Sequence, residues 1–524
     1  MRVDVDIAAF RRPLSSTTVV AMSSDTSAPV SSFTSRGYVG MGSFLIDETV
    51  DSMLRPPPHE YRAPARYVSD ADLWDASSPA PTLGPSFKAS FFLDPSWTFL
   101  NHGAFGGATR VSLSAAQRWT AYCESQPLRY IDRELFPLLV ASIRALAEFV
   151  RAPPTCVALV PNATYALSSI IGSFPLAPGD VVFCLDVAYG SVRTMLADAA
   201  TRAGARLVVG AVPFPLSTPD AFVAAITPQI PNGAALCVFD HITSNTGLLL
   251  PVAELVAGAK ARGARAVLVD GAHGLGALDL DIPSIGADYY VSNAHKWLCS
   301  AKGLGMLYVA PNVLDAVTRA HTRSPGPPRA ATVSHGYGGG FSSEFIWDGC
   351  RDYSAAVSLP SLLCWWRWVG LDRARAHCTA LLREGCELLC ARWGTALHAP
   401  WAFYSHMACV ELPARALPPG AVHAGVYACT PTHGKMLQDA LHFGFAIEVP
   451  AKTLLGPQGD MRTYVRVSAL VYNGIEDFIA LADAVDRVAW EDALPPGDAL
   501  PPGNALPRLR IQTKTDSTSQ KSEK

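Results

Sequence analysis

The chain has 524 residues, a formal net charge of −3 at pH 7 and a pI near 6.5. A charge this close to neutral excludes a broad basic surface, so neither a nucleic-acid partner nor an anionic membrane partner is expected. Hydrophobic residues make up 49% of the chain, yet they form no run of 18 uncharged apolar residues that could cross a membrane. The sequence therefore predicts a large buried core and two structured domains with tails.

The twelve cysteines indicate neither a disulfide scaffold nor a metal site. They include no Cys-x-x-Cys pair, and the chain has no His-Glu-x-x-His segment, which are spacings that commonly bind zinc. We expect reduced thiols in a reducing compartment, with the cytoplasm as the location.

Residues 1–90 are predicted to be a flexible N-terminal extension. Residues 15–35 are rich in Ser, Thr and Ala, and Asp25 is their one acidic residue. This composition is compatible with a plastid or mitochondrial transit peptide, whereas Asp4 and Asp6 argue against one.

Short apolar runs then alternate with helical segments along the chain. Seven runs have the composition of buried strands: residues 157–160, 181–184, 207–209, 235–239, 266–269, 289–291 and 306–309. Helical spacers such as residues 195–204 and 252–263 separate them. Strands separated by helices of this length form a mainly parallel sheet with helices on both faces. The sequence therefore predicts an α/β fold.

We expect this sheet to lie in a large domain of residues 91–357. The pattern turns helical from about residue 358 to 393, and residues 407–412 and 466–469 look like strands, which predicts a smaller α+β domain over residues 358–490. Residues 491–524 repeat the segment Ala-Leu-Pro-Pro-Gly and end in Ser, Thr and Lys, so a Pro-rich disordered tail is expected.

Two of the apolar runs end in polar residues that a buried strand does not need. Asp270 follows one run, and Lys296 ends the polar segment after another. Open α/β sheets place their chemistry at the carboxyl ends of parallel strands. A lysine and a carboxylate in one crevice suit pyridoxal 5′-phosphate, because lysine forms a Schiff base and a carboxylate pairs with the protonated pyridine nitrogen. Each residue taken alone also fits an N-cap or a solvated surface charge.

Two further segments offer groups that bind anions. Asn162, Ala163 and Thr164 open a helical segment, where backbone N–H groups and the helix dipole form a phosphate cradle. An ordinary N-cap is the alternative interpretation. Arg466 stands in an alternating apolar stretch, and an inward arginine fits either a ligand carboxylate or a structural salt bridge.

Together these motifs resemble the class V aminotransferase family of fold-type I pyridoxal-phosphate enzymes. The family's Asp-x-Ala-(His/Gln) stands here as Asp270-Gly271-Ala272-His273, and its (Ser/Asn)-x-His-Lys stands as Asn293-Ala294-His295-Lys296. The similarity covers about residues 99–488 and looks greatest for the isopenicillin N epimerase-like branch, which includes cysteine desulfhydrases. The resemblance implies a fold-type I PLP-dependent transferase with a seven-stranded large domain and a smaller C-terminal domain, and pyridoxal 5′-phosphate as its cofactor.

The resemblance also assigns roles to individual residues. The catalytic positions are Lys296, Asp270 and His273. Cofactor contacts are implied for these three and for Asn162, Ala163, Thr164, Tyr189, Asn245, Asn293, His295 and Cys350. The substrate-binding positions are Arg466, Asn101, His102 and Tyr337. Among these, Tyr189 matches a ring that stacks on the cofactor, Asn245 matches a side chain that binds its phenolic oxygen, and Arg466 matches a clamp for the substrate α-carboxylate.

A glycine-rich segment, residues 336–352, resembles a loop that reaches the phosphate in the neighbouring subunit. A homodimer with shared active sites is therefore expected, with Trp347 at the contact between subunits. The family usually has threonine where Cys350 stands, and a thiol is a weaker hydrogen-bond donor than a hydroxyl.

The reaction type depends on the fate of a bound amino acid once its α-proton has been removed, a step for which Lys296 is the natural base. Loss of a sulfur group from Cβ gives a C–S lyase acting on a cysteine-type substrate, which is the predicted function. Reprotonation on the other face gives an amino-acid epimerase, the close alternative, and an aminotransferase comes next. Direct sulfur transfer needs a mobile cysteine near Arg466, and no cysteine follows Cys429. A non-catalytic cofactor-binding protein is least favoured.

Overall fold

The computed structural model describes residue 44 and residues 48–65, 68–70, 72–314, 335–336, 339–423, 425–490 and 509–511. All of them belong to one unit of the chain, Val39–Lys524. The candidate transit peptide, Tyr337 and most of the expected C-terminal tail lie outside the described residues.

The seven predicted strands form one sheet, which confirms the α/β fold. In chain order they are β2 (Val157–Val160), β3 (Val181–Leu185), β4 (Arg206–Gly210), β5 (Leu236–Asp240), β6 (Val267–Asp270), β7 (Tyr289–Asn293) and β8 (Gly305–Val309). Their order across the sheet is β2-β8-β7-β6-β5-β3-β4. Neighbours from β7 to β4 run parallel, whereas β8 is antiparallel to both β7 and β2.

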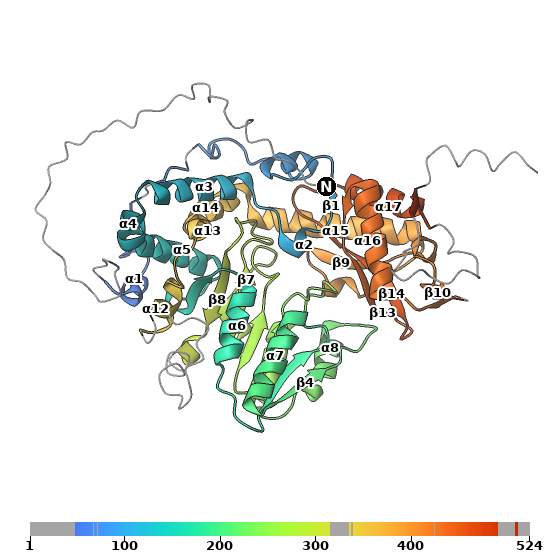
Figure 1. Cartoon of the computed structure of the whole chain (residues 1–524), viewed down its shortest axis with the longest axis horizontal. Helices are drawn as coiled ribbons and strands as arrows, with labels where there is room; N and C mark the ends of the chain where they lie inside the picture. The colour runs from blue at the N-terminus through green and yellow to red at the C-terminus, as the bar shows by residue number, and fades with distance from the viewer. Residues whose placement is uncertain are drawn as a thin grey trace, which may run out of the picture. The chain divides into compact units, whose positions relative to one another are not determined.

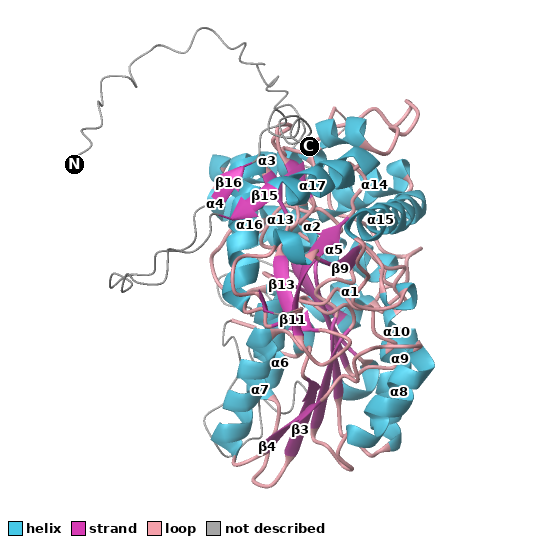
Figure 2. Cartoon of the chain, turned by 90° about the vertical axis from the view of Figure 1, so that its right-hand side faces the viewer, coloured by secondary structure: helices cyan, strands magenta, loops and turns pink. Residues whose placement is uncertain are grey.

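Helices cover both faces of this sheet. Figure 2 shows two helices on one side, α6 (Ala163–Ser173) and α7 (Gly190–Ala203), and three on the other, α8 (Pro219–Ile226), α9 (Val252–Ala261) and α10 (Ile282–Ile285). Because side chains alternate along a strand, each strand contributes side chains to two apolar clusters, one on each face of the sheet. In β3, Val182 and Cys184 pack with α6 and α7, whereas Phe183 and Leu185 pack into the cluster that contains α8 and α9.

A second, three-stranded antiparallel sheet has the order β13-β14-β9. Its strands are β9 (Met407–Glu411), β13 (Ala451–Leu455) and β14 (Met461–Ser468), which confirms the two strands expected after residue 400. The helical pattern after residue 358 corresponds to α14 (Leu359–Val369) and α15 (Leu371–Trp393), and α16 (Pro431–Phe445) and α17 (Ile475–Arg487) complete this part.

The N-terminal part of the fold forms a separate two-stranded sheet with a segment from the C-terminal part. The short strand β1 (Thr98–Phe99) pairs in parallel with β12 (Ile447–Glu448), and α2 (His102–Phe105) follows β1 directly. In Figure 1, β1 accordingly lies beside the red C-terminal elements. The remaining longer helices before the large sheet are α3 (Arg110–Ser125) and α5 (Leu135–Phe149).

The structure differs from the expected flexible extension in its second half. Helix α1 (Val50–Leu54) buries Val50 and Leu54 in the main core. Arg144 of α5 donates to the carbonyl oxygens of Leu54 and Pro56, so the Pro-rich stretch is tied to a helix and does not act as a linker. The buried side chains of Val50 and Leu54, just before these prolines, hold the segment against the core.

The expected tail also differs at one point, since β16 (Leu509–Ile511) pairs with β15 (Val488–Trp490).

Among the described residues, every helix is too short or too polar to span a membrane. The same residues contain no cluster of three or more His, Cys, Asp and Glu side chains suited to a metal ion.

Candidate active site

The carboxyl edge of the large sheet gathers the polar residues that end its strands. β5 ends at Asp240, β6 at Asp270 and β7 at Asn293. Asp240 lies opposite Asp270 in the strand register, and both residues are 3% exposed. Burial raises the pKa of Asp240, and the neighbouring Asp270 carboxylate raises it further. Two adjacent buried acids of this kind favour a cation beside them.

Lys296 lies in the loop between β7 and β8 and is partly buried. Its Nζ atom is 3.1 Å from Nε2 of His273. Its carbonyl oxygen is 3.1 Å from Nε2 of His102, whose Nδ1 is 3.0 Å from the hydroxyl of Tyr472. Burial lowers the pKa of Lys296 to about 8, because water that would solvate the ammonium is excluded.

Arg466 lies on β14, is 4% exposed and has no carboxylate partner among the described residues. One Nη atom donates to the carbonyl of Ser244 and the other to Oδ1 of Asn101 at 3.2 Å. Its Nε–H is buried and has no partner in the described part of the chain. A buried guanidinium with a free donor is costly unless an anion completes it, so this geometry fits a ligand carboxylate.

Asn101 and His102, which were predicted to contact the substrate, have protein partners here. Asn101 accepts from Arg466 and donates to Glu448 Oε1 at 3.0 Å. Both ring nitrogens of His102 are occupied, by the Tyr472 hydroxyl and the Lys296 carbonyl, and burial lowers its pKa to about 3. Both side chains therefore hold other site residues in position.

The first turn of α6 contains the predicted phosphate cradle. The Asn162 side chain accepts from the Tyr165 N–H at 2.9 Å, and the Asn293 side chain accepts from the Ala163 N–H at 2.8 Å. These bonds cap the helix and tie it to the end of β7. Thr164, which is exposed, lies at the same helix terminus, where backbone N–H groups suit an anion.

The other predicted cofactor contacts lie around the same edge. His295 is 3.3 Å from the Leu304 carbonyl through Nδ1, and burial lowers its pKa to about 4. Tyr189 immediately precedes α7 and has 41% of its surface exposed, which leaves its ring available for stacking. Asn245 is exposed on the turn after β5, and its carbonyl accepts from Cys409 Sγ at 3.7 Å.

The predicted subunit-contact loop is only partly consistent with the structure. Cys350 is exposed, but Trp347 is only 7% exposed. The indole of Trp347 stacks on Tyr353 with ring centroids 5.4 Å apart and also contacts Phe44. The expectation that Trp347 stands at a contact between subunits is therefore wrong, because its own chain buries the ring.

These residues fit pyridoxal 5′-phosphate. The paired acids Asp240 and Asp270 favour a pyridinium, the partly buried Lys296 amine is suited to a Schiff base, and the start of α6 suits a phosphate. The orphaned Nε–H of Arg466 then serves the carboxylate of an amino acid.

Two residues of the site were missed by sequence reasoning. Asp240 shows the same signal as Asp270, an acid at the end of an apolar run, and could have been found on that ground. Trp297 donates its indole N–H to Nδ1 of His273 at 3.2 Å. A tryptophan next to a lysine carries no such signal, because apolar packing explains it equally well.

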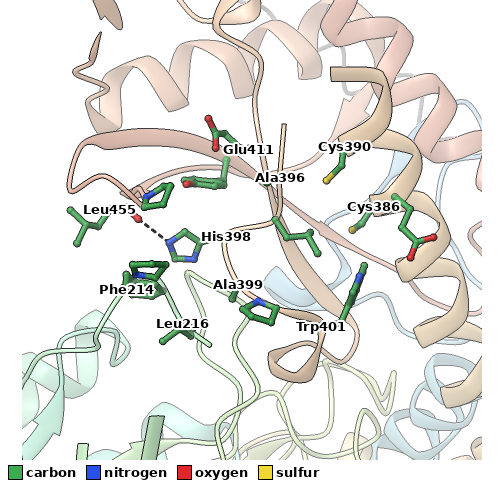
Figure 3. A pocket seen from close by; sticks show the side chains of 16 residues that line it. Phe214, Leu216, Cys386, Cys390, Ala396, His398, Ala399, Trp401, Glu411 and Leu455 are labelled. Carbon is green, nitrogen blue, oxygen red and sulfur yellow. Dashed lines mark hydrogen bonds between the residues drawn. The ribbon is translucent and has the colours of Figure 1, made fainter. Parts of the chain in front are cut away.

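Two thiols of α15 lie apart from the predicted site. Cys386 and Cys390 line a separate cavity of about 540 Å³ together with His398 and Trp401 (Figure 3). Burial raises the pKa of Cys390 to about 11. Cys409 pairs in register with Arg466, but burial raises its pKa to about 12 and its thiol donates to the Thr246 carbonyl. Thiols in this state are poor nucleophiles.

Comparisons with known proteins agree with this geometry. The sequence model of the family described as Aminotransferase class-V matches residues 139–398. A probable L-cysteine desulfhydrase, chloroplastic, from Arabidopsis thaliana is 31% identical over 75% of this chain and 83% of its own. An isopenicillin N epimerase from Streptomyces clavuligerus is 31% identical over 77% of this chain and 98% of its own.

Among solved structures, a complex of a cystine C–S lyase with its product cysteine persulfide has a TM-score of 0.60 at 19% identity. It covers 74% of this chain and 97% of the other, so it shows a shared fold. With relatives above 30% identity over most of their length, the chain belongs to the class V aminotransferase family of fold-type I enzymes, and its cofactor is pyridoxal 5′-phosphate.

Proposed function

We propose that this protein is a C–S lyase that releases the β-sulfur group of a cysteine-type amino acid. The observation that carries the proposal is Arg466, a buried guanidinium with an unused N–H and no carboxylate partner in the described chain. Its charge lies close enough to lower the pKa of Lys296. Chemistry at Cα of an amino acid needs two groups. One binds the carboxylate, and the other is an amine that moves the α-proton.

When bound, pyridoxal phosphate supplies the electron sink that makes the α-proton of an amino acid acidic. Lys296 Nζ takes that proton, since its lowered pKa keeps a large neutral fraction near pH 8. The Cα–H electron pair forms the Cα–Cβ double bond, and the sulfur leaves Cβ with the pair of the broken bond. Water then hydrolyses the released enamine, so cysteine yields pyruvate, ammonium and sulfide. Arg466 holds the carboxylate throughout, and Asn101 holds Arg466 in position.

Elimination fits the groups around Lys296 better than epimerisation does. An epimerase needs a second proton donor on the opposite face of Cα. The three histidines around Trp297 are His102, His273 and His406. Burial lowers the pKa of each one, so they are neutral and are poor acids near pH 7.

The epimerase alternative is supported by the isopenicillin N epimerase relative, which aligns over 98% of its length. Incubation of the purified protein with L-cysteine in deuterated water separates the two. A lyase releases pyruvate and sulfide in equal amounts, and Lys302→Ala, which alters a nearby lysine, should retain this activity. Deuterium at Cα of recovered D-amino acid with no pyruvate would establish epimerisation instead.

Sulfur transfer to a protein cysteine is disfavoured by the state of the thiols. Cys386, Cys390 and Cys409 have pKa values raised by burial, so each holds its proton at neutral pH. Sulfide released into solution, with no persulfide on the protein, is the expected outcome for L-cysteine. A persulfide detected on any cysteine by mass spectrometry would favour transfer.

The same proposal includes the assembly, domains and location. The protein is a homodimer in which the loop around Cys350, which is exposed, meets the partner's cofactor phosphate. Residues 91–357 form the cofactor-binding part and residues 358–490 the smaller part.

We place the protein in the cytoplasm; the chloroplastic name of the Arabidopsis thaliana relative favours organelle targeting by residues 1–90 as the alternative. A fluorescent fusion with and without residues 1–90 distinguishes the two.

A further inference from the structure

The side chain of His273 has a donor on one side and an amine on the other. It is 1% exposed, three residues beyond the end of β6. Its Nδ1 atom lies 3.2 Å from Nε1 of Trp297, and its Nε2 atom lies 3.1 Å from Nζ of Lys296. Trp297 is 2% exposed, so its indole N–H has no access to water.

The partner on the tryptophan side fixes the proton position on the imidazole. An indole N–H can only donate, so Nδ1 of His273 must accept and carries no proton. A neutral imidazole carries its one proton on the remaining nitrogen, which is Nε2. Protonation of both nitrogens would set two N–H groups against each other in a buried place, and burial and the Lys296 charge already lower the pKa of His273.

The same argument extends to Lys296. If Nε2 of His273 carries a hydrogen, the short contact to Nζ is a hydrogen bond donated by histidine to the amine lone pair. An ammonium group has three donors and no acceptor, so it cannot take part in that bond. The arrangement therefore favours the neutral amine, which is the form that reacts with an aldehyde.

We propose that Trp297 is a positioning residue that locks His273 as the Nε2–H tautomer, so that His273 is a permanent donor towards Lys296 and never a base. This inference deepens the proposed function, because it leaves Lys296 as the single proton carrier in this part of the site. It also revises the catalytic role expected for His273: the histidine favours the neutral form of Lys296 and does not exchange protons itself.

The test uses the apoprotein labelled with ¹⁵N-histidine, so its outcome does not depend on which reaction the enzyme performs. Long-range ¹H–¹⁵N correlation spectra distinguish the two neutral tautomers and the imidazolium, and His273→Gln assigns the signal among the 13 histidines. We expect one Nε2–H tautomer that does not change between pH 6 and pH 9. A wild-type signal showing Nδ1–H, or an imidazolium at pH 7, overturns the proposal without bearing on the lyase activity.

Trp297→Phe removes the indole N–H and retains an aromatic ring. Without that N–H, His273 should populate both tautomers. The pH midpoint for capture of pyridoxal phosphate by Lys296 should then rise by about one unit, which is a tenfold change in the proton affinity of the Lys296 amine. Trp366→Phe is the matched control, because it removes another buried indole N–H, which bonds to the Leu298 carbonyl at 2.8 Å. Equal tautomer and midpoint shifts in both variants, or none in Trp297→Phe, contradict the specific role of Trp297.

Discussion

Lys296 differs from the neighbouring Lys302 in what its amine contacts. Lys302 Nζ donates to the Gly106 carbonyl, whereas Lys296 Nζ contacts the ring of His273. Lys296→Ala should therefore abolish the visible absorbance of the cofactor adduct and its reduction by borohydride, and Lys302→Ala should retain both. A reducible adduct on another lysine in the Lys296→Ala variant would show that the assignment is wrong.

The lowered pKa of Lys296 predicts how capture of the cofactor depends on pH. The ammonium is unreactive towards an aldehyde, so the apoprotein reacts only through its neutral amine. Because the pKa is about 8 and an ordinary lysine titrates near 10.4, the rate of adduct formation should rise with pH and level off above about pH 9. Stopped-flow absorbance checks this; a rate still rising steeply at pH 10 would indicate an unshifted lysine.

Asp270 is expected to tune the cofactor ring without exchanging protons with the substrate. Asp270→Asn removes the negative charge but keeps a side chain of similar shape that can still form hydrogen bonds, so the cofactor should still bind. Turnover should fall by about a hundredfold or more, which corresponds to about 2.7 kcal/mol of barrier. Asp288→Asn is the control, since Asp288 is an equally buried acid that bonds to the Val267 N–H and to Lys260, away from Lys296. Turnover within threefold of the wild type in Asp270→Asn would exclude the proposed role.

At the scale of elements, the loop that carries Lys296 is packed against the end of α2. Gly106 has a φ of +68°, and a Cβ there would overlap the His295 carbonyl and come within 2.9 Å of Lys296 Cα. Gly303 has a φ of +88° and open space around it. Gly106→Ala should lower Tm more than Gly303→Ala and weaken cofactor binding, because only the former displaces Lys296 as well as straining the backbone. If Gly106→Ala and Gly303→Ala lower Tm and cofactor affinity equally, backbone strain alone would account for the loss.

The elements also show what the sequence could and could not predict. The seven strands were predictable because each is a continuous apolar run, and Asp270 and Lys296 were recognisable because polar residues at the ends of such runs are unusual. The partners of Arg466 were not predictable, since Asn101 is 365 residues away and meets it only in the folded chain, where β1 pairs with β12 and Ser468 bonds to Leu100 and His102. Burial of Trp347 and of Val50 likewise depends on tertiary packing, which periodicity does not report.

At the scale of the whole molecule, the proposed homodimer makes cofactor retention depend on assembly. Light scattering should give about twice the chain mass of 55.8 kDa, and loss of cofactor on dilution should follow dissociation. Cys350→Thr should slow cofactor release if this exposed residue meets the partner's phosphate, because a hydroxyl is the better donor. A monomer that is fully loaded and active, or faster release from Cys350→Thr, would contradict the shared site.

The pairing of distant segments has a consequence for how the protein is made. Ser468 bonds to the main chain at Leu100 and His102, and Arg466 bonds to Asn101, so the anion clamp joins the first and last thirds of the fold. A ribosome that has released residue 300 has already supplied Lys296, Asp270 and the start of α6, but not Arg466. Domains generally fold from the N-terminus during synthesis. A nascent chain therefore contains the residues proposed to bind the cofactor before it contains the residue proposed to bind the substrate carboxylate. The anion clamp can form only after β14 has left the exit tunnel.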